Sequence, residues 1–221
     1  MIKKLILNTV LILAGVPILL VFSLKVLNPP VWGWQISRTL FPPESYPDNV
    51  LHDWVPLQDI SQSMPLAVIA SEDQLFTKHY GIDIDSILSV LNETTGTPSR
   101  GASTITQQTA KNVFLFPSQT YVRKAYELYI ALLMEAILSK KRIIEVYLNV
   151  IEFGPGIYGV EAASQYYFGI AAKHLSAAQS AQLAVVLPNP YKIKPTPNTP
   201  YVQQRTQWVL TQMNNLGPIS F

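Results

Sequence analysis

The sequence predicts a mainly α-helical protein, with a single N-terminal transmembrane helix followed by one helical domain. Three observations lead to this fold class. They are an uncharged apolar run near the N-terminus, apolar residues at three- and four-residue spacing along most of the remaining chain, and few alternating patterns typical of strands. With 221 residues, 48% of them hydrophobic, the chain can form a membrane segment and one domain with a substantial core.

The apolar run extends from Leu5 to Leu24 and contains no charged residue. A helix of about 20 residues crosses the ~30 Å hydrocarbon layer, and Pro17 is tolerable in a membrane helix. Lys3 and Lys4 precede the run and favour a cytoplasmic N-terminus. The alternative is a cleaved signal peptide, with an apolar core of about 7–15 residues followed by small residues. Because "SLKVLNPP" follows instead, we expect an uncleaved anchor.

The segment after the anchor is rich in proline and tryptophan, as in "NPPVWGW" and "FPPESYPDN". Proline interrupts helices, and tryptophan favours the headgroup zone of a membrane. A neck packed on the domain or the bilayer and a simple linker are both open interpretations. The expected divisions are a cytoplasmic tail at 1–4, a transmembrane anchor at 5–27, a neck at 28–50 and the outer domain at 51–221.

Helical spacing then dominates the outer domain. The segments that show it are 66–76, 86–95, 104–115, 122–151, 157–168, 176–187 and 201–217. Pro188 and Pro190 are expected to end one helix, and Gly217 is expected to cap the last.

Composition excludes several classes of function. The chain has no cysteine, which excludes disulfides, thiolate metal sites and a cysteine nucleophile. Without the three lysines beside the anchor, 13 basic residues face 14 acidic ones, which argues against nucleic-acid binding. The sequence contains no His-x-x-x-His pair that would indicate zinc, no Ser-x-x-Lys motif that would indicate a serine transpeptidase, and no Walker-type loop that would indicate a nucleotide site.

The first candidate motif is the stretch "SEDQLFTKHYGID". On a continuous helix Glu72, Phe76 and His79 would share one face, with Asp73 to one side. A carboxylate at the edge of an apolar patch has a raised pKa and can serve as a general base. The alternative is a helix-end acid paired with Lys78.

The second motif is "RGASTITQQTAKN". Thr104 and Gln107 fit a capping box at a helix start, where free N–H groups and hydroxyls can hold an anion such as phosphate. Gln107 and Gln108 are four and three residues before Lys111, so their amides and its ammonium can converge. An ordinary, well-capped polar helix is the alternative.

The third motif is "VRKAYELYIALLME". Arg123 and Lys124 are four and three residues before Glu127, so the three side chains approach one face of a helix. An arginine and a lysine beside a glutamate suit recognition of a diphosphate. The alternative is a surface ion pair that contributes only about 0.3–0.5 kcal/mol.

Together these motifs, followed in order by "KKRIIEVYLNVIEFGPGIYGVEAASQYYFG" and "LAVVLPNP", resemble the peptidoglycan glycosyltransferase family, which polymerises the lipid-linked cell-wall disaccharide. The resemblance extends from about His52 to Leu216. With one anchor and no transpeptidase domain, the chain resembles the monofunctional members. Ala102 departs from the pattern, because the family often has a second glycine there, but every polar group of the motif is retained.

The resemblance implies a lysozyme-like fold with a large lobe and a smaller lobe that leans on the membrane. It also implies that the acceptor, lipid II, attacks C1 of the terminal N-acetylmuramic acid of a growing glycan on a polyprenyl diphosphate. A β-1,4 bond then forms with inversion. The implied location is the bacterial inner membrane, with one span, a cytoplasmic N-terminus and a periplasmic catalytic domain. Candidate partners are the bilayer, lipid II, the lipid-linked glycan and other cell-wall synthesis or division proteins.

The resemblance also implies roles for individual residues. Glu72 matches the base, and Glu127 matches a second essential carboxylate. Glu127 would orient the cations and the sugar, or hold a divalent cation, Mg²⁺ or Mn²⁺, against the diphosphate. The expected substrate-binding residues are Asp73, Phe76, His79, Ser103, Thr104, Gln107, Gln108, Lys111, Asn112, Arg123 and Lys124.

Two rival functions can be weighed against this one. A lysozyme-like lytic enzyme that cleaves glycan needs an acidic glutamate but no cations for a diphosphate. A membrane-anchored scaffold with vestigial motifs predicts no turnover. In addition, Phe114, Leu115 and Phe116 form a short apolar run that belongs either to the core or to a loop that dips into the bilayer.

Overall fold

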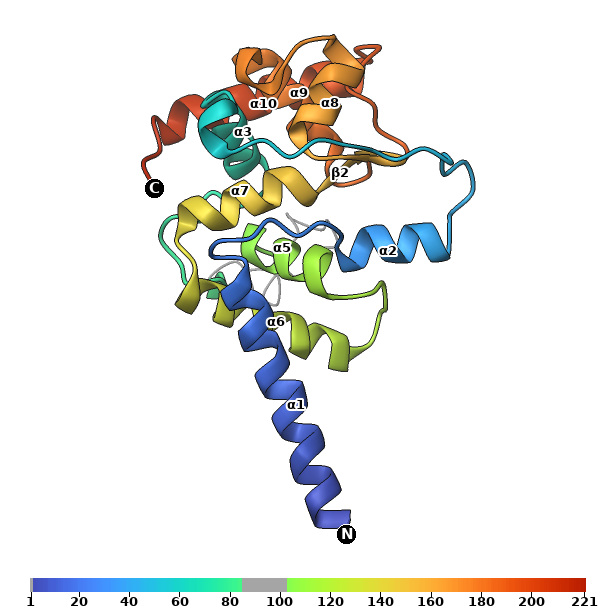
Figure 1. Ribbon diagram of the computed structural model, residues 1–221. Coiled ribbons are helices and arrows are strands. Elements are labelled where there is room, and N and C mark those ends of the chain that lie inside the picture. The colour runs from blue at the N-terminus through green and yellow to red at the C-terminus, as the bar shows by residue number, and fades with distance from the viewer. Residues whose placement is uncertain (1, 85–102) are drawn as a thin grey trace, which may run out of the picture.

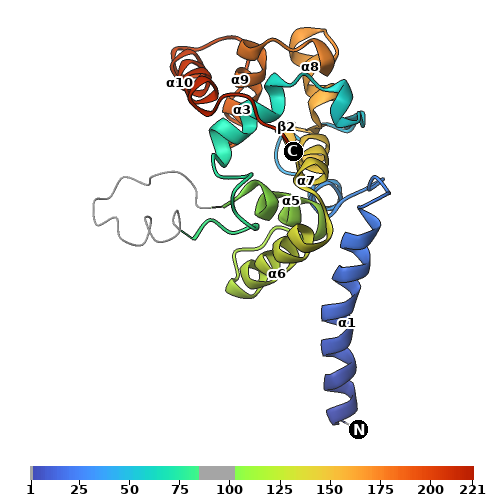
Figure 2. The same cartoon turned by 90° about the vertical axis from the view of Figure 1, so that its left-hand side faces the viewer.

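The computed structural model describes residues 2–84 and 103–221. The helix expected at 86–95 and residue Ala102 lie outside them. Figure 1 shows a helical domain in two tiers, with α3, α8, α9 and α10 in the upper tier, α5 and α6 in the lower tier, and α7 between them. Helix α1 projects from the lower side, and a view turned by 90° shows the same arrangement (Figure 2). The prediction of a mainly helical protein is confirmed.

Helix α1 spans Ile2–Ser23, so it begins inside the expected tail and ends before the expected end of the anchor. The C-terminal end of α1 packs into the domain, because Val21 and the following Leu24 are buried in the core. Among the described residues, no helix combines the length and apolar character needed to cross a bilayer. The transmembrane span therefore stays a prediction.

Pro17 lies at the part of α1 that contacts α6 in the lower tier. Pro17 has no N–H group, so the carbonyl of Leu13 lacks its usual donor within the helix. Two phenols of α6 (Tyr121–Ile137) bond at this turn. The hydroxyl of Tyr126 donates to the Leu13 oxygen at 2.9 Å, and that of Tyr129 donates to the Ala14 oxygen at 2.7 Å. Side chains of α6 thus supply hydrogen bonds where the proline interrupts α1.

The neck contains a helix, α2 (Gly33–Leu40), that the proline-rich composition did not predict. It packs on the C-terminal end of α5 (Ile105–Phe114). A Cβ atom at Gly33 would lie 2.8 Å from the Leu115 oxygen, so this approach requires glycine. Trp32 is only 1% exposed and packs edge-on against His52 and Tyr158. The neck is therefore packed on the domain and is not a free linker.

The upper tier forms around α3 (Ser63–Glu72), which packs against α9 (Ala177–Val186) and α10 (Pro200–Leu216). A short 3-10 turn, η1 (Leu57–Asp59), precedes α3, and η2 (Ala172–His174) precedes α9. Gly217 follows α10 with a positive φ of 68°, as expected for a helix cap. Helix α3 is buried along most of its length, so its last residue emerges from the core.

The segment expected to be helical over 122–151 forms two helices, α6 and α7 (Lys140–Val150). Ser139 separates them, because its hydroxyl accepts a hydrogen bond from the N–H of Arg142 at 3.2 Å and caps α7. Four consecutive polar residues, 139–142, mark this break, and the expectation of one continuous helix did not take them into account. Helix α5 packs on both α6 and α7.

A small sheet lies beside the upper tier. Its strands are β1 (Leu51–His52), β2 (Glu152–Gly154) and β3 (Ile157–Tyr158), in the order β1-β3-β2. β3 is parallel to β1 and antiparallel to β2. The helix expected at 157–168 begins later, as α8 (Val160–Phe168), because 157–158 pair in the sheet and Gly159 turns the chain with φ of 79°.

Candidate active site

The first motif does not continue as a helix. Helix α3 ends at Glu72, and Asp73 leaves it with φ of −157° and ψ of 77°. The prediction that Glu72, Phe76 and His79 share one helix face is therefore wrong, because turns follow Asp73. The turn before Glu72 is buried, so the helix reaches Glu72 from the core.

Glu72 is partly buried and accepts hydrogen bonds from two polar side chains. The amide nitrogen of Gln108 donates to its Oε2 at 3.1 Å, and the hydroxyl of Ser71 donates to its Oε1 at 3.2 Å. Burial raises the pKa of Glu72, and these two hydrogen bonds lower it in part. None of the ion pairs among the described residues involves Glu72, so the alternative of a pair with Lys78 is not observed. A carboxylate of this kind is suited to accept a proton.

A buried tyrosine orients the amide that contacts Glu72. The hydroxyl of Tyr147, on α7, donates to Oε1 of Gln108 at 3.2 Å. Burial raises the pKa of Tyr147 well above its usual value, so this hydroxyl keeps its proton and acts as the donor. With its oxygen engaged by Tyr147, Gln108 presents its NH₂ group to Glu72.

Asp73 and His79 fasten the turns after Glu72 to the start of α5. Nε2 of His79 lies 2.8 Å and 3.0 Å from the two oxygens of Asp73, and the N–H of Ile105 donates to Asp73 at 2.9 Å. Nδ1 of His79 accepts from the N–H of Gly81 at 3.1 Å, so Nε2 carries the proton. Phe76 is fully buried. These contacts place Asp73, Phe76 and His79 as supports of the site, and their contact with substrate stays a prediction.

The start of α5 is capped as the second motif predicts, with one difference. The hydroxyl of Thr104 accepts from the N–H of Gln107 at 3.1 Å and donates to the Gly81 oxygen at 2.7 Å. In a full capping box the side chain of Gln107 would return to the backbone of Thr104. Instead, it donates to the Gly81 oxygen at 3.3 Å and accepts from Nζ of Lys124 at 3.3 Å. Ser103 also accepts from Lys124, at 3.2 Å.

The third motif forms a compact ionic cluster on α6. Nη1 of Arg123 and Nζ of Lys124 each lie 2.5 Å from one oxygen of Glu127. Glu127 is only 3% exposed, whereas both cations are partly exposed. The cluster is therefore not an ordinary surface ion pair, because a buried carboxylate holds two cations whose outer sides face solvent.

Lys111 interacts electrostatically with both Glu127 and Glu72. Burial lowers the pKa of Lys111, Glu127 and Glu72 raise it, and Arg123 and Lys124 lower it. Its ammonium makes no hydrogen bond or ion pair with any other residue that the structure describes. This charge is thus unneutralised by direct contact, as a group that receives an anion would be. Asn112, the next residue, is buried on the same helix.

Glu127 does not suit a divalent cation. Each of its oxygens already bonds a cationic side chain. Over residues 2–84 and 103–221, no group of three or more histidine, aspartate or glutamate side chains is arranged to hold a metal ion. The donor set therefore does not fit Mg²⁺ or Mn²⁺, and we assign no step to a metal.

Sequence reasoning missed two side chains that act on Glu72. Tyr147 orients Gln108, and Arg205 on α10 lowers the pKa of Glu72 through its charge. Both come from parts of the chain far from the three motifs. Local spacing carries no signal for either contact, because only the packing of α7 and α10 brings them to the site.

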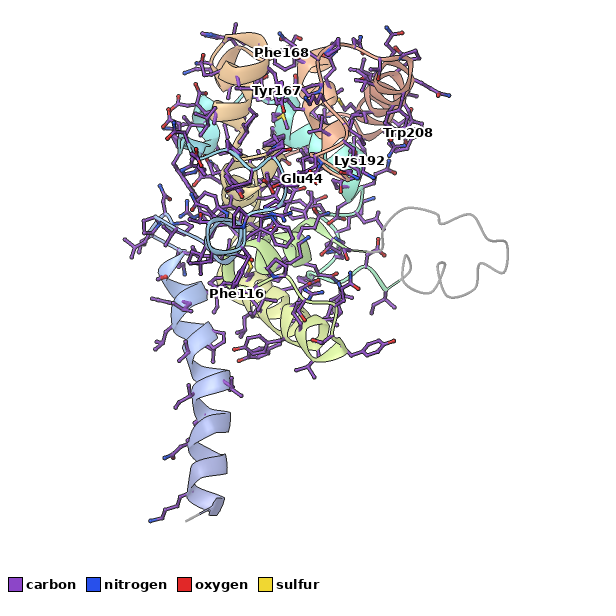
Figure 3. The ribbon with its side chains drawn as sticks, turned by 90° about the vertical axis from the view of Figure 1, so that its right-hand side faces the viewer. Glu44, Phe116, Tyr167, Phe168, Lys192 and Trp208 are labelled. Carbon is purple, nitrogen blue, oxygen red and sulfur yellow. The ribbon has the colours of Figure 1, made fainter. Side chains whose placement is uncertain are left out.

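The apolar run 114–116 at the end of α5 was expected either in the core or in a loop that dips into the bilayer, and its residues differ in exposure. Leu115 is buried and Phe114 packs partly against the core, whereas Phe116 is 51% exposed. Figure 3 places Phe116 in the lower half of the molecule, away from the labelled residues of the upper tier. Leu115 therefore belongs to the core, and only Phe116 is available to another surface.

A desolvated carboxylate on one helix, an unneutralised lysine on a second and an arginine–lysine pair on a third define the class of protein. These groups suit a helical acid–base enzyme whose substrate carries a strongly anionic group.

The chain belongs to the transglycosylase family, whose profile, described as Transglycosylase, matches residues 43–214. A protein of Vibrio parahaemolyticus named "Biosynthetic peptidoglycan transglycosylase" is 60% identical over 218 residues, which cover 98% of this chain and 97% of that protein. Proteins with the same name from Shewanella amazonensis and Aeromonas hydrophila are 50% and 48% identical. They cover 90% and 89% of this chain, and 82% and 84% of their own lengths are matched.

Proposed function

We propose that this protein is a peptidoglycan glycosyltransferase that polymerises lipid II into the β-1,4 glycan strands of the cell wall. Membership of the transglycosylase family and relatives named for peptidoglycan biosynthesis support this activity. The observation that carries it is that one helix, α5, bonds Glu72 through Gln108 and Lys124 through Gln107, and carries Lys111 one turn further on.

Glu72 is the general base in the proposed reaction. The 4-hydroxyl of lipid II attacks C1 of the donor's terminal N-acetylmuramic acid and transfers its proton to Glu72. The bond from O4 to C1 forms as the bond from C1 to the diphosphate oxygen breaks, and the electron pair leaves with the polyprenyl diphosphate. The attack comes from the face opposite the leaving group, so the configuration at C1 inverts. The hydrogen bonds from Gln108 and Ser71 hold the carboxylate in place.

The cations stabilise the charge that builds up on the diphosphate. Lys111 makes no acceptor contact within the described chain, so its N–H donors are available to phosphate oxygens. Lys124 and Arg123 add charge while Glu127 fixes their positions. A diphosphate leaves readily without a proton, and a dedicated general acid is not required. Glu127 therefore acts in this mechanism as a support of the cations.

The lytic alternative is not favoured. Cleavage of finished glycan breaks a bond between two sugars, and no diphosphate is released. The Lys111, Lys124 and Arg123 side chains would then have no anionic group to stabilise. The positive charges of Lys111, Lys124 and Arg123 agree with transfer from a diphosphate and have no use in hydrolysis.

The proposal includes the lysozyme-like, two-lobed form of the domain and its location at the bacterial inner membrane. The two tiers support the former. For the latter, α1 projects from the domain, and Lys3 and Lys4 at its start favour a cytoplasmic N-terminus with a periplasmic domain. Among the side chains of α1 that the structure describes, the large exposed apolar ones are Leu11, Ile12, Leu13, Val16, Ile18, Leu19, Leu20 and Phe22. Other cell-wall synthesis or division proteins stay candidate partners.

The test is polymerisation of purified lipid II by the full chain. We expect the wild type to form glycan strands, and Glu72→Gln to bind lipid II and stay folded without polymerising, because only the proton acceptor is lost. Glu44→Gln, at an exposed glutamate of the neck, is the matched control and should be active. A wild type that cleaves finished cell wall but leaves lipid II unchanged would favour the lytic enzyme, and rapid polymerisation by Glu72→Gln would exclude Glu72 as the base.

A further inference from the structure

Lys111 has an aromatic neighbour from a part of the chain outside the three motifs. Its Nζ lies 5.3 Å from the centre of the Trp34 ring, on the neck helix α2. A partly buried ammonium needs compensation for lost water, and Lys111 has no acceptor among the described residues. The ring of a tryptophan attracts a cation electrostatically at this distance.

Trp34 is itself held by a buried carboxylate. Its Nε1–H donates to Oε2 of Glu152 at 3.1 Å. Glu152 is 5% exposed and also accepts from the hydroxyl of Tyr191 at 2.9 Å. The guanidinium of Arg38 lies 4.8 Å from the centre of the same Trp34 ring, and its Nε is 3.6 Å from Glu152. The orientation of the indole is therefore fixed from the side of β2.

The backbone around Trp34 is fixed as well. Gly33 approaches the backbone of Leu115 so closely that a Cβ atom would lie 2.8 Å from its oxygen. Trp32 is buried in the core. Helix α2 is thus packed on α5, the helix that carries both Lys111 and Gln108.

We propose that Trp34 is a positioning residue that holds the ammonium of Lys111 ready for the diphosphate. A ring face attracts the charge without neutralising it, so the ammonium keeps N–H donors for phosphate oxygens. A carboxylate in the same place would bond those donors, as Glu127 does with Lys124. The proposal rests on the proposed function, and it makes the neck helix part of the catalytic apparatus.

A double-mutant cycle separates this role from simple packing. We expect Trp34→Leu to lower kcat/KM for lipid II polymerisation by about 2- to 30-fold, the range that corresponds to a cation–π contact. Trp34→Phe keeps a ring face and should retain more activity than Trp34→Leu. In a Lys111→Gln background, Trp34→Leu should cause no further loss of lipid II binding, because Trp34 acts through Lys111.

Trp54→Leu is the matched control. Arg142 lies 5.6 Å from the centre of the Trp54 ring, so this variant also removes a tryptophan beside a cation, but away from Glu72 and Lys111. We expect its kcat/KM to stay near that of the wild type. Equal activity of Trp34→Leu and the wild type would overturn the proposal. So would losses that multiply in the Lys111→Gln background, because they would indicate a packing role.

Two further outcomes are informative. If Trp34→Leu unfolds, the same cycle with Trp34→Phe decides the question. A smaller loss for Trp34→Phe in the Lys111→Gln background supports the proposal, and an undiminished loss overturns it. If the wild type itself fails to polymerise lipid II, the proposed function fails first. Activity in the wild type with no coupling between the two residues refutes only the role of Trp34.

Discussion

Replacement of Gln108 by leucine tests how the environment of Glu72 sets the pH dependence of the enzyme. Gln108 donates to the carboxylate at 3.1 Å, and this hydrogen bond lowers the pKa of Glu72 against the raising effect of burial. Gln108→Leu removes the hydrogen bond and leaves an apolar side chain of similar size beside Glu72. The pKa of Glu72 should therefore rise further, and the base should be protonated up to a higher pH.

The magnitude follows from the type of hydrogen bond. A hydrogen bond to a charged group contributes about 1.5–3 kcal/mol, which corresponds to a rate factor of about 13 to 160 on the acidic limb of the pH–rate profile. At alkaline pH, where Glu72 is ionised in both proteins, the difference should shrink. Tyr147→Phe removes only a neutral hydrogen bond to Gln108, so its effect should be about 2- to 10-fold in the same direction.

The assay is kcat/KM for lipid II polymerisation as a function of pH, for the wild type, Gln108→Leu, Tyr147→Phe and the control Gln203→Leu. Gln203 is exposed on α10, and its amide donates to the Asn198 oxygen. We expect the control to follow the wild-type profile. A loss in Gln108→Leu that is constant at every pH would refute the reasoning, because it would mean that Gln108 only binds substrate.

Three further predictions concern stability, membrane contact and the cations. Burial raises the pKa of Glu72, so its charged form destabilises the fold; this cost is absent below the ordinary carboxyl pKa and grows as pH rises. The Tm of Glu72→Gln should therefore exceed that of the wild type by an amount that increases from pH 4 to pH 8. A difference in Tm that falls with pH would contradict this. Phe116→Ser should lower vesicle binding without changing Tm. Leu115→Ala should instead lower the free energy of unfolding by about 2–5 kcal/mol, measured by denaturant titration. The reverse pattern would show that Phe116 is the core residue. Glu127→Gln should lower the pKa of Lys111, since Glu127 raises it. The pKa can be measured from the rate of amine modification as a function of pH. An unchanged pKa of Lys111 in the variant would mean that the two groups do not interact.

The parts of the structure that were predictable from sequence depend on short-range spacing. Arg123, Lys124 and Glu127 lie within one turn of α6, so their contact follows from helix geometry once the helix is recognised. The cap at Thr104 and the end at Gly217 follow from residue chemistry in the same way. The helices themselves follow from the spacing of their apolar residues.

The parts that were not predictable depend on a local interruption or on distant packing. Helix α3 stops at Glu72, which removed the helix face expected to join Glu72 to His79. The cap at Ser139 divides a segment that we expected to form one helix. Tyr147 and Trp34 reach the site only because α7 and α2 pack on α5. No pattern near the motifs could reveal those two contacts.

The bonds from Tyr126 and Tyr129 to the Pro17 turn of α1 have a consequence for where the reaction takes place. Tyr126 is three residues from Arg123 on the same helix, about 4.5 Å along its axis. The distance between the Arg123–Lys124 pair and the middle of α1 is therefore set by direct contacts and not by the length of a flexible tether. In the membrane-anchored arrangement that we propose, any shift of α1 along the bilayer normal would carry these side chains with it by the same amount.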